Sequence, residues 1–553
     1  MPAHDAQSTT RRRRALTLVL AAIATVAVIV GVLLAVGWPA DEEAGVRPSP
    51  TEAAEDASGR PDTWSPHRPA VHLTPDKDWM NDPQKPFLLD GVWHYYYLYN
   101  ADYPDGNGTA WYHATSTDLV HWRDEGVAIE KYANGLGDIW TGTAVVDEKG
   151  TAGFGAGAVV AIVTQQDDGV QRQSLFVSQD GGYSFDSFAG NPIMENPGVA
   201  DWRDPRVFWD ESARHWVMAL AEHDRIGFYA SPDLRDWTYT SDFSTSGLGV
   251  LECPDLFPMS VDGDPDDVRW VLAAGANGAA EGMTTGTAYW VGDWDGERFT
   301  PDGTGHQWLD HGPDYYAAVT WDDPRRASDE RLASRYGIGW MNNWAYAGDL
   351  PGDGWHGGSD SLVRTISLRS DGAGATLHSA PAPELGGLAG DPQPLGDTRV
   401  DADVPLDVEV PASGAYRLTL TASSAEAESG ELRVKVLTGD GTSATVGYDF
   451  DAGVAFVAHD ADAIAGRMPE PYREVRTATV ATADGRIDLD IVVDAASIEM
   501  FAGDGEVAMT MATFGSTGDR GLRIEGVDGA VRVTDASLTP LRVAPVERVA
   551  GRG

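Results

Sequence analysis

Cysteine and basic residues are scarce in this chain. Its 553 residues contain one cysteine, Cys253, so no disulfide can form within the chain. We interpret Cys253 as a small buried apolar residue rather than a redox group. Lys and Arg number 40 against 85 Asp and Glu, which gives a formal net charge of −45. Such a surface repels nucleic acid and anionic polymers but is indifferent to neutral polymers such as polysaccharides.

Motifs for metals and nucleotides are also missing from the sequence. The 13 histidines show no paired spacing typical of metal ligands. No glycine-rich loop follows a strand and opens a helix, as a phosphate-binding loop would. We therefore expect neither a metal nor a cofactor.

The N-terminus carries a membrane signal. Four arginines, 11–14, precede an uncharged and mostly apolar run over residues 15–36, and Trp38 follows. As a helix, this run would be about 33 Å long, against roughly 30 Å for the hydrocarbon core of a bilayer. A cleaved signal peptide has a shorter apolar region of about 7–15 residues. We expect a cytoplasmic stub over residues 1–14 and a single-pass anchor over 15–37, with the remainder outside the cell. A cleaved segment, and hence a secreted protein, is the alternative.

The rest of the chain indicates an all-β protein. Residues 38–63 have no apolar periodicity and are predicted to be a disordered linker. Over residues 64–385, short β-like runs alternate with turn residues, and no amphipathic helix of a dozen residues is found. Similar segments that begin at Ser116, Ser178 and Ser231 recur at roughly 60 residues, a spacing that favours the blades of a propeller.

A second domain is predicted after a linker over residues 386–399. Residues 400–545 alternate apolar and polar side chains, as in 416–420 and 487–491. This period of two is typical of a half-buried antiparallel sheet, and we expect a β-sandwich. Residues 546–553 are predicted to be a loose tail.

Three acidic residues are each followed closely by a proline, in Asn81-Asp82-Pro83, Arg203-Asp204-Pro205 and Glu252-Cys253-Pro254. Proline fixes its own φ and pushes the preceding residue into an extended conformation. Each motif alone fits an ordinary turn or ion pair. Three repetitions of the device favour carboxylates that are held for catalysis.

Together these motifs resemble the glycoside hydrolase family 32 β-fructosidases. The resemblance covers nearly all of residues 64–545. The segments that carry it are Trp79-Met80-Asn81-Asp82-Pro83, Arg203-Asp204-Pro205, Glu252-Cys253-Pro254-Asp255, Trp140-Thr141-Gly142-Thr143, Trp111 with its following segment to Trp122, residues 314–317, residues 338–344 and residues 497–501. It implies a five-bladed β-propeller followed by a C-terminal β-sandwich, with the active site in the axial funnel of the propeller.

The resemblance also implies the catalytic roles. Asp82 corresponds to the nucleophile that attacks the anomeric carbon of fructose, and Glu252 to the acid/base, which must start protonated. Asp204 corresponds to the transition-state stabiliser, and we expect the charge of Arg203 to keep it ionised. The further predicted substrate-binding residues are Trp79, Asn81, Trp111, Trp140, Thr141, Arg203, Cys253 and Trp344. For each of the four tryptophans, a place in the hydrophobic core is an equally good alternative.

The chain departs from the commoner family pattern in three places. Gln84-Lys85-Pro86 stands where invertase-like members have Asn-Gly, Leu98 where they have glutamine, and His356 where an arginine is expected. This variant looks more like the levanase-type branch, which acts on β-2,6-linked fructan. The resemblance therefore implies a retaining hydrolase of fructans, most of all levan. An inulinase or invertase-like enzyme, a fructosyltransferase and a non-catalytic fructan-binding protein are the alternatives. The expected partner is a fructan substrate.

Overall fold

The computed structural model describes residues 60–61, 64–106, 108–278, 285–350, 355–356, 358–370, 372, 374–425, 429–438, 444–459, 469–514 and 520–548. The predicted stub, the predicted anchor over residues 15–37 and most of the predicted linker 38–63 lie outside these ranges. Within the described ranges, no helix has the length and apolar character needed to cross a membrane. The fold given below is that of the unit formed by residues 55–553.

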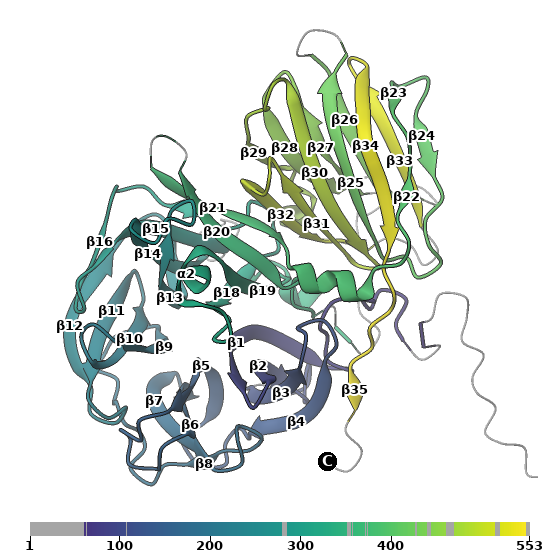
Figure 1. Cartoon of the computed structure of the whole chain (residues 1–553). Coiled ribbons are helices and arrows are strands. Elements are labelled where there is room, and N and C mark those ends of the chain that lie inside the picture. The colour runs from purple at the N-terminus through teal and green to yellow at the C-terminus, as the bar shows by residue number, and fades with distance from the viewer. Residues whose placement is uncertain are drawn as a thin grey trace, which may run out of the picture. The chain divides into compact units, whose positions relative to one another are not determined.

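Five antiparallel sheets make up the first part of the fold. Their strands, sheet by sheet, are β1 (Trp79–Leu89), β2 (Val92–Asn100), β3 (Ala110–Ser116) and β4 (Arg123–Ile129); β5 (Asp138–Asp147), β6 (Ala158–Asp167), β7 (Val170–Ser178) and β8 (Asp186–Ser187); β9 (Trp202–Asp210), β10 (His215–Glu222), β11 (Arg225–Ser231) and β12 (Thr238–Ser244); β13 (Val250–Ser260), β14 (Val268–Asn277), β15 (Gly286–Trp294), β16 (Phe299–Pro301) and β17 (Gln307–Trp308); and β18 (Tyr316–Trp321), β19 (Arg335–Trp340), β20 (Arg364–Ser370) and β21 (Ala375–Pro381). Figure 1 shows these sheets as blades in a ring, with the first strand of each blade innermost. The innermost strands contact one another around the ring, β1 with β5 and β18, β9 with β5 and β13, and β13 with β18.

Turn chemistry in the sequence accounts for the blades. Asp90-Gly91 joins β1 to β2 and Asp168-Gly169 joins β6 to β7, in each case with positive φ at both residues. Such two-residue turns match the twist of a β-hairpin and favour Asp-Gly. The recurring segments found in the sequence each begin at the last residue of a third strand. There the serine Oγ accepts hydrogen bonds from backbone amides of the turn to the outermost strand, as Ser116 does from Leu119 (2.8 Å) and Ser178 from Gly182 (2.8 Å).

Helical elements are short in the described part of the chain. They are the α-helix α2 (Ser328–Ala333) and the 3₁₀ helices η2 (Ala347–Asp349), η3 (Pro383–Leu388) and η4 (Glu470–Arg473). Apolar clusters instead fill the spaces between neighbouring blades. One, for example, packs Val160 and Ile162 of β6 against Met218 and Leu220 of β10.

Two further sheets form the C-terminal part. Their strands are β22 (Gln393–Pro394), β23 (Thr398–Val400), β24 (Leu406–Val408), β25 (Tyr416–Ser424), β26 (Glu431–Thr438), β27 (Ala444–Asp449), β28 (Val454–His459), β29 (Arg476–Thr479), β30 (Arg486–Asp494), β31 (Ser497–Ala502), β32 (Val507–Ala512), β33 (Gly521–Val527) and β34 (Val531–Pro540). Both sheets contribute their buried alternate residues to one core cluster, as a sandwich requires. The predicted all-β class, a five-bladed propeller followed by a sandwich, is confirmed.

Two segments outside the predicted domains form strands. β22 and the start of β23 lie in the predicted linker 386–399 and pair with β34. β35 (Glu547–Arg548) lies in the predicted tail and pairs in parallel with β4 of the first blade. Strands of two or three residues are too short to show an alternating pattern, so they could not be predicted from periodicity.

A buried ionic network joins the last blade to the sandwich. Arg364 of β20 donates to Asp310 Oδ2 (2.7 Å) and to Glu499 Oε2 of β31 (2.6 Å). Glu499 Oε1 lies 3.0 Å from Nε2 of His72, whose Nδ1 lies 2.9 Å from Asp494. The hydrogen bonds of the two acids outweigh burial and raise the pKa of His72 to about 9. The imidazolium is therefore the stable form at neutral pH.

Candidate active site

A cavity of about 490 Å³ opens at the end of the ring where the innermost strands begin. Its wall includes the three proline-associated acids and an arginine beside them. The residues that line it are Trp79, Asn81, Asp82, Leu98, Asn100, Tyr103, Gly108, Thr109, Asp138, Trp140, Thr141, Gln171, Asp201, Arg203, Asp204, Glu252, Trp344, Ala347 and Gly348.

A β-bulge interrupts each innermost strand at this cavity. In β1 the regular register breaks at Asp82, in β9 at Asp204-Pro205 and in β13 at Cys253-Pro254. β5 and β18 show the same irregularity. A bulge leaves a residue outside the ladder and turns its side chain, and proline is tolerated there because it has no N–H to donate. This is the structural reason for the acid–proline motifs in the sequence.

Asp82 is held by hydrogen bonds from two sides. Its Oδ2 accepts from Thr141 Oγ1 at 2.7 Å and its Oδ1 from Asn81 Nδ2 at 3.1 Å. Asn81 is itself fixed by the indole of Trp79, which donates to Asn81 Oδ1 at 2.9 Å. Burial and the nearby Glu252 carboxylate raise the pKa of Asp82, against these hydrogen bonds.

Cys253 links Asp82 to Asp204. Its Sγ lies 3.6 Å from Asp82 Oδ2 and 3.6 Å from Asp204 Oδ2, and its backbone N–H donates to Asp204 Oδ2 at 3.0 Å. Cys253 and Asp204 both have left-handed backbone, with φ of 45° and 64°, so the extended conformation expected before Pro254 and Pro205 is wrong for these two residues, which lie in bulges. Such backbone in a residue other than glycine is strained and is typical of functional sites. The short thiol therefore occupies the space between two carboxylates, where a larger side chain would separate them.

Glu252 faces the same space with both carboxylate oxygens occupied. Its Oε1 accepts from Arg203 Nη2 (2.7 Å) and Nε (3.1 Å). Its Oε2 accepts from Asn277 Nδ2 (3.0 Å) and from the hydroxyl of Tyr316. Burial, together with the Glu252 charge, raises the pKa of Tyr316 well above its usual range, so the phenol remains a donor.

The expectation that Arg203 keeps Asp204 ionised is wrong. The guanidinium pairs with Glu252 and with Asp201, whereas its Nε lies 4.0 Å from Asp204 Oδ2. Burial raises the pKa of Asp204 to about 7 despite the attraction of Arg203, and the charges of Glu252 and Asp82 add to the rise. Carboxylates that crowd one buried site cannot all ionise freely, so the group holds a proton near neutral pH.

Aromatic rings form one wall of the cavity. The ring of Trp79 lies 6.3 Å from that of Trp344, nearly parallel, and 4.7 Å from that of Tyr103. Trp344 is 37% exposed, which is unusual for so large an apolar side chain. The exposed ring of Trp344, backed by the buried ring of Trp79, is suited to contact the apolar face of a sugar.

Most of the predicted site residues meet at this cavity. Asp82, Asp204, Glu252, Trp79, Asn81, Trp140, Thr141, Arg203 and Trp344 line it, and Cys253 contacts two of the acids. Trp111 is fully buried instead, stacked on Tyr96, with its indole donating to the Trp140 carbonyl (3.0 Å). It belongs to the core between the first two blades.

The three departures from the family pattern are separated in space. Leu98 lines the cavity and is the strand partner of Asn81. Gln84 is fully buried and bridges β1 and β5 by accepting from the Gly142 amide (2.8 Å), whereas Lys85 lines a different cavity. His356 contacts the ring of Tyr103, 4.9 Å between centroids.

Several residues of this site were not predicted as site residues from the sequence, among them Asn277 and Tyr103. Asn277 is the last residue of β14 and reaches Glu252 only because β14 pairs with β13. Tyr103 comes from the loop after β2 and packs on Trp79. Sheet register and loop conformation position these side chains, and neither can be read from a local pattern.

Comparison with known proteins gives a consistent family. Residues 72–381 match the glycosyl hydrolases family 32 N-terminal domain and residues 389–540 the family 32 C-terminal domain. A levanbiose-producing levanase of Bacillus subtilis is 42% identical over 465 residues, which is 83% of this chain and 88% of that protein. An extracellular exo-inulinase of Meyerozyma guilliermondii is 30% identical over 503 residues, 86% of this chain and 96% of that protein. The crystal structure of an exo-inulinase from Aspergillus awamori superposes with a TM-score of 0.77 at 26% identity, covering 87% of this chain and 99% of that one.

Proposed function

Because the chain belongs to glycosyl hydrolase family 32, we propose that it is a retaining hydrolase of the β-fructofuranosidic bonds of fructans, with levan as its preferred substrate. The observation that carries the proposal is the convergence of Asp82, Asp204 and Glu252 in one cavity, with the first two on either side of Cys253. A retaining glycosidase needs a nucleophilic carboxylate and a second carboxyl group that first gives and then takes a proton.

Asp82 is proposed as the nucleophile. One of its Oδ atoms attacks the anomeric C2 while the C2–O bond to the rest of the fructan breaks, which forms a covalent fructosyl-enzyme. Thr141 and Asn81 fix the carboxylate by hydrogen bonds and so limit its orientation.

Glu252 is proposed as the acid/base. It gives its proton to the leaving oxygen and then removes one from the water that attacks C2 in the second step. Tyr316 and Asn277 donate to Oε2, and Arg203 donates to Oε1, so these contacts position the carboxylate that takes the proton of the water in the second step. The protonated form that acts in the first step must release one of these donors.

Asp204 is proposed to bind two hydroxyls of the fructosyl ring and to stabilise the positive charge that develops there. The further proposed contacts are Trp79, Asn81, Trp140, Thr141, Arg203, Cys253 and Trp344. Trp111 is not among them, because its side chain is buried away from the cavity.

The preference for levan is supported by Leu98 and by the similarity to a levanase. An apolar side chain beside Asn81 leaves a substrate hydroxyl without a partner, which costs roughly 1–3 kcal/mol. A polymer offsets this loss by placing further rings on the aromatic wall, whereas sucrose cannot. We expect kcat/KM to fall from levan to inulin to sucrose.

The experiment compares initial rates of the full chain on levan, inulin and sucrose at one pH, with analysis of the products. Release of fructose or levanbiose from levan indicates hydrolysis, and chain lengthening indicates fructosyl transfer. Carbon NMR of trapped early product should show β-fructofuranose, because two displacements retain configuration. If sucrose were turned over fastest, the proposed specificity for levan would be contradicted. If the early product were α-fructofuranose, the role of Asp82 as nucleophile would be contradicted.

We also propose that the enzyme works outside the cell. The arginines at 11–14 and the apolar run at 15–36 support an anchor or signal segment, and a relative is named as extracellular. Membrane fractions washed with high salt should retain the enzyme if the N-terminal segment is not cleaved. A mature N-terminus found between residues 36 and 55 would instead indicate cleavage and secretion. As domain limits we propose residues 64–385 for the propeller, extended by β35, and residues 400–545 for the sandwich, extended by β22 and β23.

A further inference from the structure

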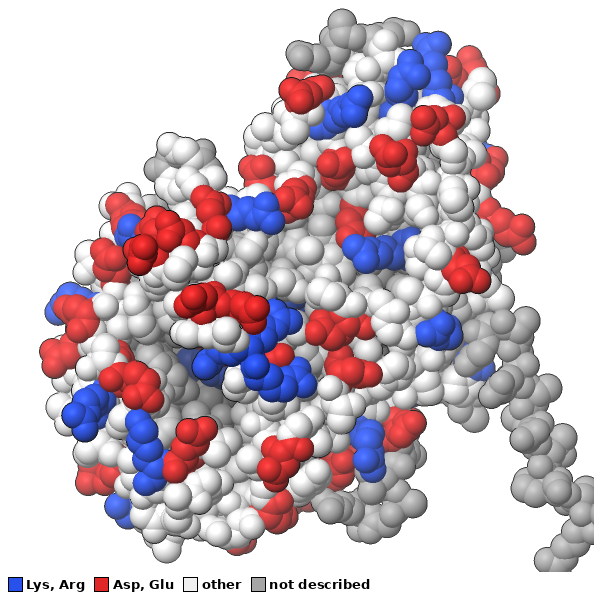
Figure 2. Space-filling model, in the orientation of Figure 1, with Lys and Arg blue, Asp and Glu red and all other residues white. Residues whose placement is uncertain are grey.

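A second cavity, of about 630 Å³, lies at the opposite end of the innermost strands. β1, β5, β9 and β13 each contribute residues to both cavities, the earlier residues to the first and the later ones to the second. On β1, for example, Asp82 lines the first cavity and Lys85 the second. Figure 2 shows Lys and Arg side chains gathered beside α2 on this face of the propeller.

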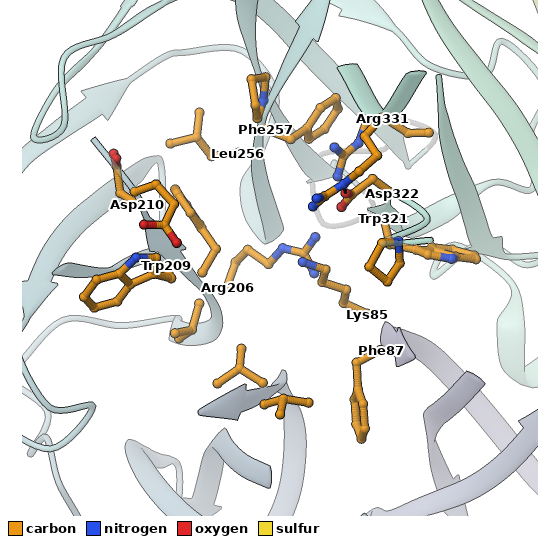
Figure 3. A pocket seen from close by; sticks show the side chains of 18 of the residues that line it. Lys85, Phe87, Arg206, Trp209, Asp210, Leu256, Phe257, Trp321, Asp322 and Arg331 are labelled. Carbon is orange, nitrogen blue, oxygen red and sulfur yellow. Dashed lines mark hydrogen bonds and ion pairs between the residues drawn. The ribbon is translucent and has the colours of Figure 1, made fainter. Parts of the chain in front are cut away.

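Four cations line one side of the second cavity: Lys85, Arg206, Arg331 and Arg335. Figure 3 shows the nitrogen-bearing ends of Lys85 and Arg206 pointing toward one another across its centre. Burial, together with the charge of Arg206, lowers the pKa of Lys85 to about 7. Like charges therefore crowd this space.

Two of these cations have nitrogen atoms without a hydrogen-bond or ion-pair partner among the described residues. Among the described residues, no hydrogen bond or ion pair involves the Lys85 ammonium. Arg335 is 6% exposed and uses only its Nε, which donates to Thr320 Oγ1 at 3.1 Å, while its guanidinium stacks over Phe257. The terminal nitrogens of Arg335 thus find no acceptor within the described protein, although buried donors are almost always hydrogen-bonded.

Nearby acids compensate only part of this charge. Asp255 is buried and pairs with Arg206 (2.8 Å), and Asp322 pairs with Arg331. Lys85 and Arg335 lack such a contact, though Asp322 attracts both.

Three more acids line the cavity, but they lie apart from the cations. Figure 3 shows Asp210 on the wall opposite Lys85. Its carboxylate accepts from the Ser212 and Ala213 amides and from the Trp294 indole. Glu211 contacts Lys149 instead, at 3.3 Å, and Glu148 completes this acidic wall.

We propose that this second cavity binds a small oxyanion, carrying phosphate or carboxylate groups, between Lys85, Arg206 and Arg335. A planar or tetrahedral oxyanion supplies the acceptors that the terminal nitrogens of Arg335 and the Lys85 ammonium need. Its charge also relieves the repulsion among the cations. The site is separate from the proposed catalytic cavity, and the inference stands whether or not the chain hydrolyses fructan.

The size and walls of the cavity fit a small molecule. A volume of about 630 Å³ lies within the range of small-ligand sites. Phe87, Phe257 and Trp321 supply apolar walls beside the cations. The net charge of −45 repels anions at long range, so the site needs direct contacts rather than the general field of the protein.

The test is isothermal titration calorimetry of the full chain with inorganic phosphate and, in a second arm, with citrate. We expect saturable binding of one anion per chain in at least one arm, and the arm with the higher affinity identifies the oxyanion class. Lys85→Gln should weaken that binding about tenfold or more, because a hydrogen bond to a charged partner is lost. Lys85→Glu should abolish it.

The matched control is Lys77→Gln, which removes the same charge from a lysine that is 66% exposed. It should leave the affinity unchanged, and thermal melts should show that all three variants are folded. Asp82→Asn should also bind with wild-type affinity, since Asp82 lines the other cavity. Binding to neither anion, or equal weakening by Lys77→Gln and Lys85→Gln, would overturn the proposal.

Discussion

The buried network between the last blade and the sandwich allows a stability prediction to be worked out from its contacts. We consider Glu499→Gln, which keeps the shape of the side chain. Oε2 of Glu499 accepts from Arg364 Nε and Nη2, and Oε1 accepts from the Leu362 amide (2.7 Å) and contacts His72. Every neighbour is a donor, so either orientation of a glutamine amide points its NH₂ group at another donor.

The substitution therefore removes a negative charge, and the buried cations Arg364 and His72 lose their ion pairs with Glu499. Breaking a buried ion pair from one side costs about 3–5 kcal/mol. We expect the unfolding free energy, measured by urea titration of the full chain, to fall by about this amount. Glu431→Gln is the control, because Glu431 pairs with Arg433 at the surface and should change stability by about 1 kcal/mol or less. A loss below about 1 kcal/mol in Glu499→Gln would refute the claim that the network is tightly coupled.

Three further predictions concern the same molecule. The unfolding free energy should depend on pH through His72, whose pKa is raised to about 9 in the folded protein. The stabilisation by the His72 imidazolium is complete below about pH 6.5, the pKa of a free histidine, and is lost as the pH rises through 9. The total loss should be about 3 kcal/mol. Unfolding free energies measured between about pH 6.5 and 9 test this dependence, and Glu499→Gln should make it shallower. An equally steep pH dependence in the variant would contradict the role of His72. Asp82→Asn should keep the melting temperature near that of the wild type, whereas Glu252→Gln should lower it, because both oxygens of Glu252 accept only from donors. Both variants should remain folded but lower turnover of levan, the second by about 10²–10⁴-fold; near-wild-type rates would contradict the assignment. Leu98→Gln should raise kcat/KM for sucrose relative to levan by about 5- to 100-fold, since it restores a partner worth roughly 1–3 kcal/mol; an unchanged ratio would show that Leu98 does not set the preference.

Motif order in the sequence was sufficient to predict the blades and the acids, because both depend on short local segments. The acid–proline pairs coincide with bulges, and a bulge is specified by a few consecutive residues. The repeated serine turns likewise lie within single connections between strands. Signals that lie within a few consecutive residues can be recognised in the sequence without knowledge of the fold.

Pairing across the site could not be predicted in the same way. Arg203 stands next to Asp204 in the sequence, and adjacency suggested an ion pair, yet its guanidinium reaches Glu252 on the neighbouring blade. Adjacent residues on a bulged strand need not point in the same direction, whereas residues 49 apart meet where two innermost strands converge. Lys85 gives a second example, since it lies three residues from Asp82 yet lines the cavity at the other end of β1.

The electrostatics of the candidate active site are connected to the proposed chemistry. Burial and mutual repulsion raise the pKa values of Asp82 and Asp204 although Arg203 lies nearby, so the carboxylates destabilise one another. In the proposed transition state positive charge develops on the fructosyl ring, beside these groups. The attraction is then larger than in the ground state, where the bound sugar is neutral. Only such differential interactions accelerate a chemical step, so the same crowding that opposes folding of this site favours its reaction.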